Sequence, residues 1–355
     1  MNGHSTVNTA NTALVLGASG GIGGEVARQL LRSGWRVRAL KRGVEPGLET
    51  GLEDSAPAHG RAHAGAIEWI GGDALDPAAV ARAAHGCTVI VHAVNPPGYR
   101  DWEKLALPML ENSIAAAAAE GALIVLPGTV YNYGPDVFPL IRDGAAQRPL
   151  TRKGQVRVRM EQKLRDHAAD GGRALIVRAG DFFGPRAGNN WFSQVMVKAG
   201  LPVTRITNPA RAGVGHQWAY LPDLAATMAA LIERRAVLPA FASYHFGGHW
   251  DPDGEAMANA IARSVHAHGG AMPKIARFPW WTVPLAAPFV RLMRELTEMR
   301  YLWREPIRLD NAALRAVLGN EPHTPLDAAV DATLRGLDCL PTGAEDALLR
   351  FGTNS

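Results

Sequence analysis

The sequence predicts an α/β fold with a doubly wound parallel sheet and a smaller, interleaved C-terminal part. Short apolar runs alternate with segments of helical periodicity along the first half of the chain. The runs are continuously apolar, which is typical of parallel strands buried on both faces. After residue 180 the alternation breaks into shorter segments rich in Gly, Pro and aromatic residues. We therefore expect a second part, built differently from the sheet.

Each expected element has its own local signal. An apolar run ending in glycines predicts a strand at residues 12–16. Ser33 and Gly34 end the predicted helix at 25–31, and Pro77 begins the next predicted helix at 77–84. Pro222 and Asp223 are start signals for a helix at 219–234. The other expected strands cover 36–40, 67–70, 88–93, 122–126 and 174–178, and the other helices 102–119 and 155–168.

These elements predict how the chain is organised. Residues 12–180 form a nucleotide-binding domain to which 214–234 return, while 181–213 and 235–345 form the substrate-binding part. Residues 1–11 are expected to be a flexible N-terminus, 43–65 a loop and 346–355 a tail.

Composition excludes several classes of protein. A chain that is 47% hydrophobic and 20% charged is neither disordered nor fibrous. The net charge of +4 comes from scattered Lys and Arg, so nucleic acid is not an expected partner. Cys87 and Cys339 stand alone, which predicts no disulfide framework and no metal site. Without a signal peptide or an apolar span, we expect a cytoplasmic protein with no membrane partner.

A glycine-rich loop joins the first strand to the first helix. The spacing GxxGxxG lets the backbone approach a pyrophosphate, and the helix N-terminus supplies free N–H donors. This context predicts a dinucleotide site of the Rossmann type, with a merely structural turn as the alternative. The expected contacts are Gly17, Ser19, Gly20, Gly21, Ile22 and Gly23.

The end of the second strand bears on the choice of dinucleotide. An acidic residue there would accept the ribose hydroxyls of NAD, but this chain has Lys41 and Arg42, which suit a 2′-phosphate. We expect NADP, with NAD as the alternative. Asp73 and Ala74, after the third strand, are expected beside the adenine; a turn carboxylate is the other interpretation of Asp73.

Five motifs together resemble the short-chain dehydrogenase/reductase superfamily, in its extended, atypical NAD-dependent epimerase/dehydratase-like branch. They are GASGGIGG at 17–24, GDALD at 72–76, HAVN at 92–95, TVYNYG at 129–134 and HQWAYLPDLA at 216–225, and the resemblance covers residues 12–233. It implies a nicotinamide cofactor over the strand ends and a C-terminal part that selects a small-molecule substrate. It also adds Ala93, Val94 and Asn95 to the expected cofactor contacts.

The family's catalytic pair is a tyrosine followed four residues later by a lysine, and here those positions hold Lys153 and Arg157. We expect Lys153 to donate or accept a proton and Arg157 to hold a ribose or substrate oxygen. A solvated cationic helix face is the alternative. Thr129 is the nearest equivalent of the family's hydroxyl residue, and Tyr131 is a further candidate acid.

Two functions remain open at this point. The first is an NAD(P)-dependent oxidoreductase or epimerase-like enzyme that moves hydride between nicotinamide and a carbonyl or alcohol carbon. The second is a non-catalytic, NADP-sensing regulatory protein. The helices at 104–119 and 155–168 are where a homodimer would form. Expected substrate contacts are Asp181, Phe182, Asn189, Asn190, Trp191 and His216.

Overall fold

The computed structural model describes residues 11–43, 66–96, 102–188, 190–286 and 296–340. The chain divides into two compact units that alternate along the sequence. The first comprises Met1–Gly128, Arg152–Arg178 and Ala225–Tyr244, and the second Thr129–Thr151, Ala179–Leu224 and His245–Ser355. Residues 1–10 of the expected N-terminus, residues 44–65 of the expected loop and the expected tail at 346–355 lie outside the described residues.

A seven-stranded sheet forms the first unit, in the order β11-β7-β5-β4-β1-β2-β3. The strands from β7 to β3 pair in parallel. Their bounds are β1 Thr12–Leu16, β2 Arg36–Lys41, β3 Glu68–Gly71, β4 Val89–His92, β5 Leu123–Gly128, β7 Arg173–Arg178 and β11 Phe241–His245. β1 and β4 are buried along their whole length, which explains their continuous apolar sequence.

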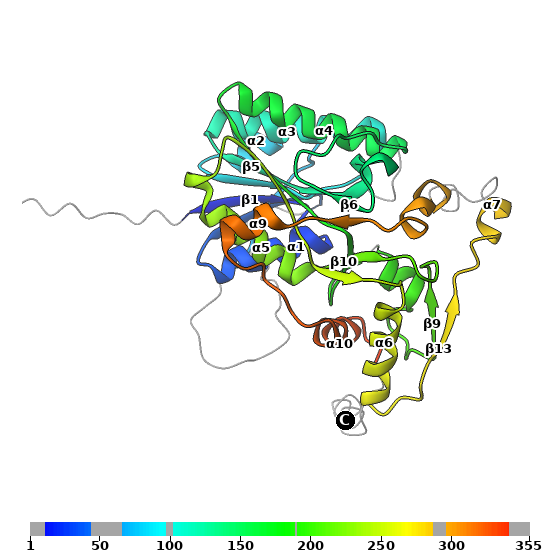
Figure 1. Cartoon of the computed structure of the whole chain (residues 1–355). Helices are drawn as coiled ribbons and strands as arrows, with labels where there is room; N and C mark the ends of the chain where they lie inside the picture. The colour runs from blue at the N-terminus through cyan, green and yellow to red at the C-terminus, as the bar shows by residue number, and fades with distance from the viewer. Residues whose placement is uncertain (1–10, 44–65, 97–101, 189, 287–295, 341–355) are drawn as a thin grey trace, which may run out of the picture. The chain divides into compact units, whose positions relative to one another are not determined.

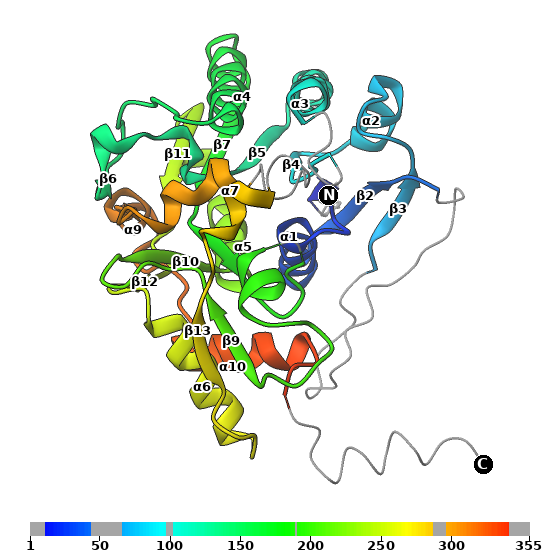
Figure 2. The same cartoon turned by 90° about the vertical axis from the view of Figure 1, so that its right-hand side faces the viewer.

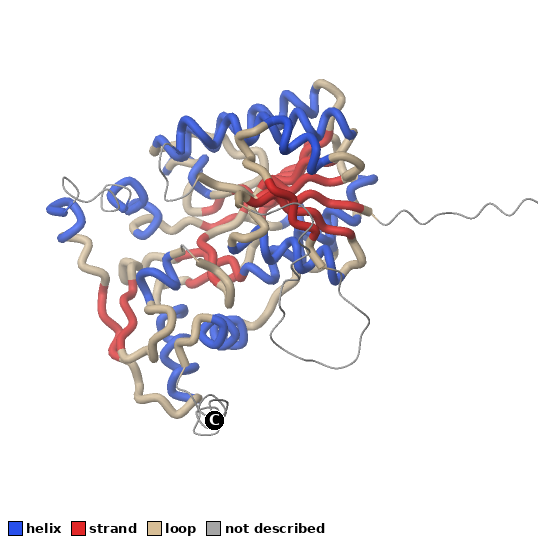
Figure 3. The backbone as a smooth tube through the Cα atoms, turned by 180° about the vertical axis from the view of Figure 1, so that it is seen from behind, coloured by secondary structure: helices blue, strands red, loops and turns tan. Residues whose placement is uncertain are grey.

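Helices cover both faces of this sheet (Figure 1). α2 (Pro77–Ala84), α3 (Trp102–Glu120) and α4 (Arg152–Ala169) lie on one face, and α1 (Gly21–Arg32) and α5 (Leu221–Glu233) on the other. Seen from behind, the strands form the middle layer between two layers of helix (Figure 3). The predicted α/β doubly wound architecture is confirmed. Its core under α2, α3 and α4 is built from residues such as Leu14, Ile90, Ile124, Leu110 and Leu164.

Several boundaries differ from the sequence expectation. α4 begins at Arg152, not at residue 155, so Lys153 lies in its first turn. Ala219 and Tyr220 belong to a strand because they pair with Phe182 and Phe183, and α5 starts only at Leu221. Residues 241–245 fall in the range expected to form the substrate-binding part, yet they form a strand at the edge of the large sheet beside β7. No local signal distinguishes such an edge strand, since its partner lies far away in the sequence.

Small sheets and helices form the second unit. β10 (His216–Tyr220) lies between β8 (Asp181–Phe183) and β12 (His249–Asp251); β9 (Arg205–Asn208) pairs with β13 (Lys274–Arg277), and β6 (Leu140–Ile141) with β14 (Arg308–Leu309). Figure 2 shows β9 beside β13, with α6 (Ala256–Ala267) and α10 (Leu326–Gly336) below. This unit also contains α7 (Thr282–Ala286), α9 (Ala312–Leu318) and a π-helix at Phe192–Met196.

The core of the second unit contains several large aromatic side chains. Phe183, Phe192, Trp218 and Trp303 are all nearly inaccessible to solvent there. In neither unit does a helix within the described ranges have the length and apolar character needed to cross a membrane.

Candidate functional site: a dinucleotide loop and an aromatic cluster

The glycine loop closes tightly against the end of β4. Gly17 has φ +88°, and a Cβ on it would lie 2.6 Å from the carbonyl carbon and oxygen of Ala93. A Cβ on Gly23 would lie 2.2 Å from the carbonyl oxygen of Gly17, so neither position has room for a side chain. The loop thus brings Gly17 against Ala93 and Val94, three residues that the sequence assigned to one site. Ser19 and Gly20 are exposed.

α1 starts directly after this loop with its N-terminus open. Gly20 is the N-cap and contributes no side-chain hydrogen bond, and the first turn contains no acidic residue. The first N–H groups of a helix have no partner within the helix, and they carry the positive end of its dipole. This end of α1 can therefore receive an anionic group such as a pyrophosphate.

Lys41 and Arg42, the two basic residues expected to bind a 2′-phosphate, have different surroundings at the end of β2. Lys41 lies over the ring of Trp69, with Nζ 5.4 Å from the ring centroid. Arg42 is 68% exposed and its NH1 lies 3.9 Å from Oδ2 of Asp73. Asp73 Oδ1 also accepts the N–H of Leu75 at 2.9 Å, so this carboxylate supports its own turn. The exposed Arg42 side chain is free to reach a phosphate group of a ligand from the solvent. The hydrogen bond between Asp73 and Leu75 is the one expected if Asp73 is a turn carboxylate.

Arg157 does not lie on a solvated helix face. Its side chain is buried, with NH1 3.4 Å from the carbonyl oxygen of Pro127 and NH2 3.4 Å from Oδ1 of Asn95. The guanidinium also lies 5.4 Å from the ring centroid of Trp102. Because Pro127 is near the end of β5 and Asn95 follows β4, this cation lies at the carboxyl ends of two central strands. Ligands of doubly wound sheets bind at that edge.

His92 is a residue of this edge that the sequence analysis missed. It ends β4, and its Nδ1 lies 2.8 Å from Oγ of Ser113, which itself donates to the carbonyl oxygen of Met109. Burial, together with the charge of Arg157, lowers the pKa of His92 to about 3. The ring is therefore neutral at physiological pH. A polar residue that ends a fully apolar strand was the available signal.

Thr129 and Tyr131 belong to the second unit. The Thr129 hydroxyl accepts the N–H of Tyr131 at 3.3 Å and donates to Oδ1 of Asn132 at 3.4 Å, so it caps the short 3-10 helix Val130–Asn132. Tyr131 is partly buried against the core of the second unit. Both side chains thus have local structural contacts.

Three of the expected substrate contacts come together in the second unit. Asp181 Oδ2 lies 2.9 Å from Nε2 of His216, and the His216 ring stacks on Trp303 with centroids 3.9 Å apart. Trp191 contacts the same Trp303 ring edge-on at 5.0 Å.

The other expected contacts are arranged differently. Phe182 follows Asp181 in β8 and so points to the opposite face of that strand. Asn190 uses its side chain locally, donating to Ala187 and accepting from Ser193. Asn189 lies outside the described residues.

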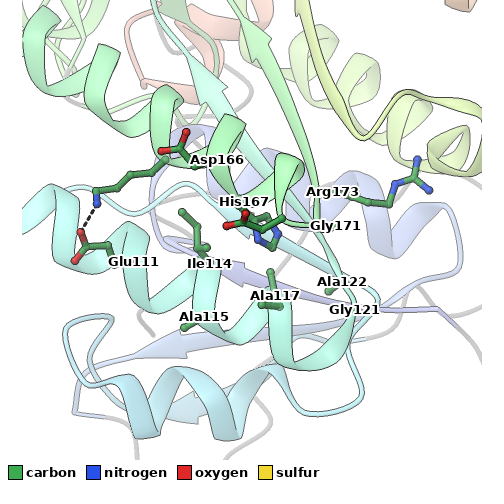
Figure 4. A pocket seen from close by; sticks show the side chains of 14 residues that line it. Glu111, Ile114, Ala115, Ala117, Gly121, Ala122, Asp166, His167, Gly171 and Arg173 are labelled. Carbon is green, nitrogen blue, oxygen red and sulfur yellow. Dashed lines mark ion pairs between the residues drawn. The ribbon is translucent and has the colours of Figure 1, made fainter.

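A cavity of about 630 Å³ lies elsewhere on the first unit, between the C-terminal parts of α3 and α4 (Figure 4). Glu111 and Lys163 form an ion pair of 2.7 Å at its side, and Asp166 and His167 also line it. Its lining reaches Ala122 and Arg173 at the start of β5 and β7, the edge of the sheet opposite the glycine loop. It is therefore not the dinucleotide site. Across the described ranges, no group of three His, Cys, Asp or Glu side chains could hold a metal ion.

A glycine loop at the carboxyl edge of a doubly wound parallel sheet defines a Rossmann NAD(P)-binding protein. Residues 13–245 match the NAD dependent epimerase/dehydratase family, and the chain belongs to this family of enzymes. The family resemblance predicted from the motifs is confirmed.

Solved structures of low sequence identity share the whole fold. A UDP-glucose 4-epimerase from Brucella ovis in complex with NAD aligns with a TM-score of 0.68 and 16% identity, over 93% of this chain and 99% of that one. The enzyme WbmH from Bordetella bronchiseptica in complex with NAD+ gives 0.64 and 18%, over 93% and 99%. A UDP-glucose-4-epimerase from Stenotrophomonas maltophila, with bound NAD and formylated UDP-arabinopyranose, gives 0.67 and 15%, over 92% and 98%. A search of curated proteins finds no sequence match.

Proposed function

We propose that this chain is a nicotinamide-dependent oxidoreductase or epimerase that moves hydride between the cofactor and a carbonyl or alcohol carbon. The observation that carries the proposal is the buried guanidinium of Arg157 beside Asn95 and Pro127. Burying a cation is costly, so its retention at the carboxyl ends of β4 and β5 favours a role in binding there.

The residues present fit a nicotinamide dinucleotide. The cramped glycine loop and the open N-terminus of α1 suit its pyrophosphate. Arg157 donates hydrogen bonds to a ribose or substrate oxygen, and Lys153 in the first turn of α4 donates or accepts the proton at the reacting oxygen. The bound nicotinamide supplies the hydride chemistry.

We propose NADP as the preferred cofactor because Lys41 and Arg42 stand where an acidic residue would select NAD. NAD is the alternative, since the related structures are complexes with NAD. Nucleotide sugars are the first substrates to test, because related structures contain UDP sugars.

Calorimetry separates the two cofactors. We expect the wild-type protein, stripped of nucleotide, to bind NADPH at least about tenfold more tightly than NADH, because a 2′-phosphate adds one charge-assisted contact. Arg42→Ala removes this preference, whereas Arg82→Ala, an exposed arginine of α2, preserves it. Equal affinities in the wild type contradict the NADP preference, and no binding of either nucleotide contradicts the proposed function.

Turnover tests the roles of Lys153 and Arg157. With a panel that includes UDP-glucose, Lys153→Ala should lower kcat by about 10²-fold or more with little change in cofactor affinity, as expected on removing a general acid or base. Arg157→Gln should weaken cofactor binding instead. Arg159→Gln, an exposed neighbour on α4, is the control. Unchanged turnover in Lys153→Ala excludes the proton-transfer role.

A non-catalytic dinucleotide sensor is the second candidate. It is favoured by the replacement of the Tyr-Lys pair by Lys153 and Arg157, because binding does not need proton transfer. Tight cofactor binding together with no hydride transfer to any member of the panel would select this candidate.

A further inference from the structure

A buried histidine–aspartate pair in the second unit retains one nitrogen for a ligand. Asp181 Oδ2 lies 2.9 Å from His216 Nε2, and the His216 side chain is 8% exposed. A carboxylate only accepts hydrogen bonds, so Nε2 is the nitrogen that donates to Asp181. In the tautomer with a single proton on Nε2, Nδ1 has a lone pair that accepts a hydrogen bond. Within the described residues, Nδ1 has no hydrogen-bond partner.

Aromatic neighbours hold this ring in place. Trp303 stacks on His216 with an interplanar angle of 9°, and Trp218, two residues along β10, contacts it edge-on at 5.0 Å. Asp181 fixes the rotation of the ring within the plane that Trp303 sets. An acceptor with one fixed direction is pre-organised for binding, because little side-chain entropy is lost when a ligand arrives.

The two tryptophan rings that contact His216 each carry an unpaired hydrogen-bond donor. Among the described residues, the buried Tyr301 hydroxyl and the indole N–H groups of Trp218 and Trp303 have no hydrogen-bond partner. Burial raises the pKa of Tyr301, and the charges of Asp181 and Glu298 raise it further, so the phenol stays protonated. Buried donors left without a partner are costly.

Two other charged residues of this unit have contacts of their own. Asp251 lies opposite His216 in the β10–β12 pairing, and its carboxylate accepts the N–H groups of Ala256 and Met257. Arg300 lies over the ring of Trp280. Asp181 is therefore the carboxylate hydrogen-bonded to the His216 ring.

We propose that His216 is a specificity-determining residue whose Nδ1 accepts a hydrogen bond from a substrate hydroxyl, with Asp181 as its positioning residue. The ligand that fits carries a hydroxyl group that donates to Nδ1. That the bound molecule is the substrate of a nicotinamide-dependent enzyme rests on the proposed function. The tautomer of His216 does not depend on it.

Nitrogen NMR of the holo protein with ¹⁵N-labelled histidine tests the assignment directly. We expect His216 in the Nε2–H form, and addition of UDP-glucose as the probe should shift the Nδ1 resonance. Asp181→Asn keeps an acceptor oxygen and should keep this tautomer, whereas Asp181→Ala should give a mixture. An Nδ1–H form in the wild type, or UDP-glucose that binds without shifting Nδ1, overturns the proposal.

Calorimetry with UDP-glucose measures the contribution to affinity. His216→Gln should weaken binding about tenfold, the value of one hydrogen bond, with cofactor affinity unchanged. His268→Gln, which alters another histidine–aspartate pair of the same unit, is the matched control. Equal affinities of His216→Gln and wild type overturn the proposal.

Absence of UDP-glucose binding has a different meaning. It removes nucleotide sugars from the proposed function, and the tautomer of His216 in the free protein then decides the present assignment: Nε2–H supports it and Nδ1–H overturns it.

Discussion

Gly17 combines two constraints that a side chain would violate. Its φ of +88° is strained for any L-residue with a Cβ, and the Cβ itself would meet the backbone of Ala93 at 2.6 Å. Gly34 has a similar φ of +82° but open space around it. A substitution at Gly34 therefore measures the cost of the backbone conformation alone. We expect Gly34→Ala to lower the free energy of unfolding by about 1 kcal/mol and to leave cofactor binding unchanged.

Gly17→Ala should cost more, about 3 kcal/mol, and should weaken dinucleotide binding at least about tenfold because the loop must move away from β4. Urea unfolding and calorimetry of both variants check this. Equal losses of stability would mean that the contact with Ala93 adjusts without cost.

A short connection between α9 and α10 is held by one carboxylate. Glu321 accepts the N–H groups of Gly247 and Gly248, each at 2.7 Å, and the side-chain amide of Asn311 at 2.8 Å. Glu321→Ala leaves these donors without their acceptor, so we expect a loss of about 2–3 kcal/mol in the free energy of unfolding. Glu305→Ala, an exposed glutamate, should change it by less than about 0.5 kcal/mol. A similar small change in both variants would mean that water replaces the carboxylate.

Each unit contains a buried histidine that resists protonation. Burial lowers the pKa of His92 to about 3 and that of His249 to about 4, from 6.5. Because the unfolded chain takes up these protons first, stability is unaffected above pH 6.5 and falls as the pH drops toward the folded values. At pH 5 the loss is roughly 2 kcal/mol per group.

Urea unfolding at pH 7 and pH 5 measures this loss. His92→Gln should reduce it by roughly 2 kcal/mol, whereas His85→Gln, whose side chain is 86% exposed, should not. An identical pH dependence in His92→Gln and wild type would show that His92 accepts a proton in the folded state.

The local sequence determined the first unit up to its sixth strand. Apolar runs, glycine spacing and helix signals act over a few residues, so they specify strands, the loop at Gly17 and the family without long-range information. The same signals predicted that Gly17 and Ala93 lie in one site, because the carboxyl ends of parallel strands share one edge of a sheet. In the structure the two residues are in contact.

Tertiary structure alone decided the features that depend on distant partners. The edge strand β11 requires β7 beside it, and the burial of Arg157 requires Asn95 and Trp102 around it. The pairing of Asp181 with His216 joins residues 35 positions apart. Such contacts produce no periodic pattern in the sequence. The type of a residue determines its own chemistry, but only the fold determines which distant side chain lies next to it.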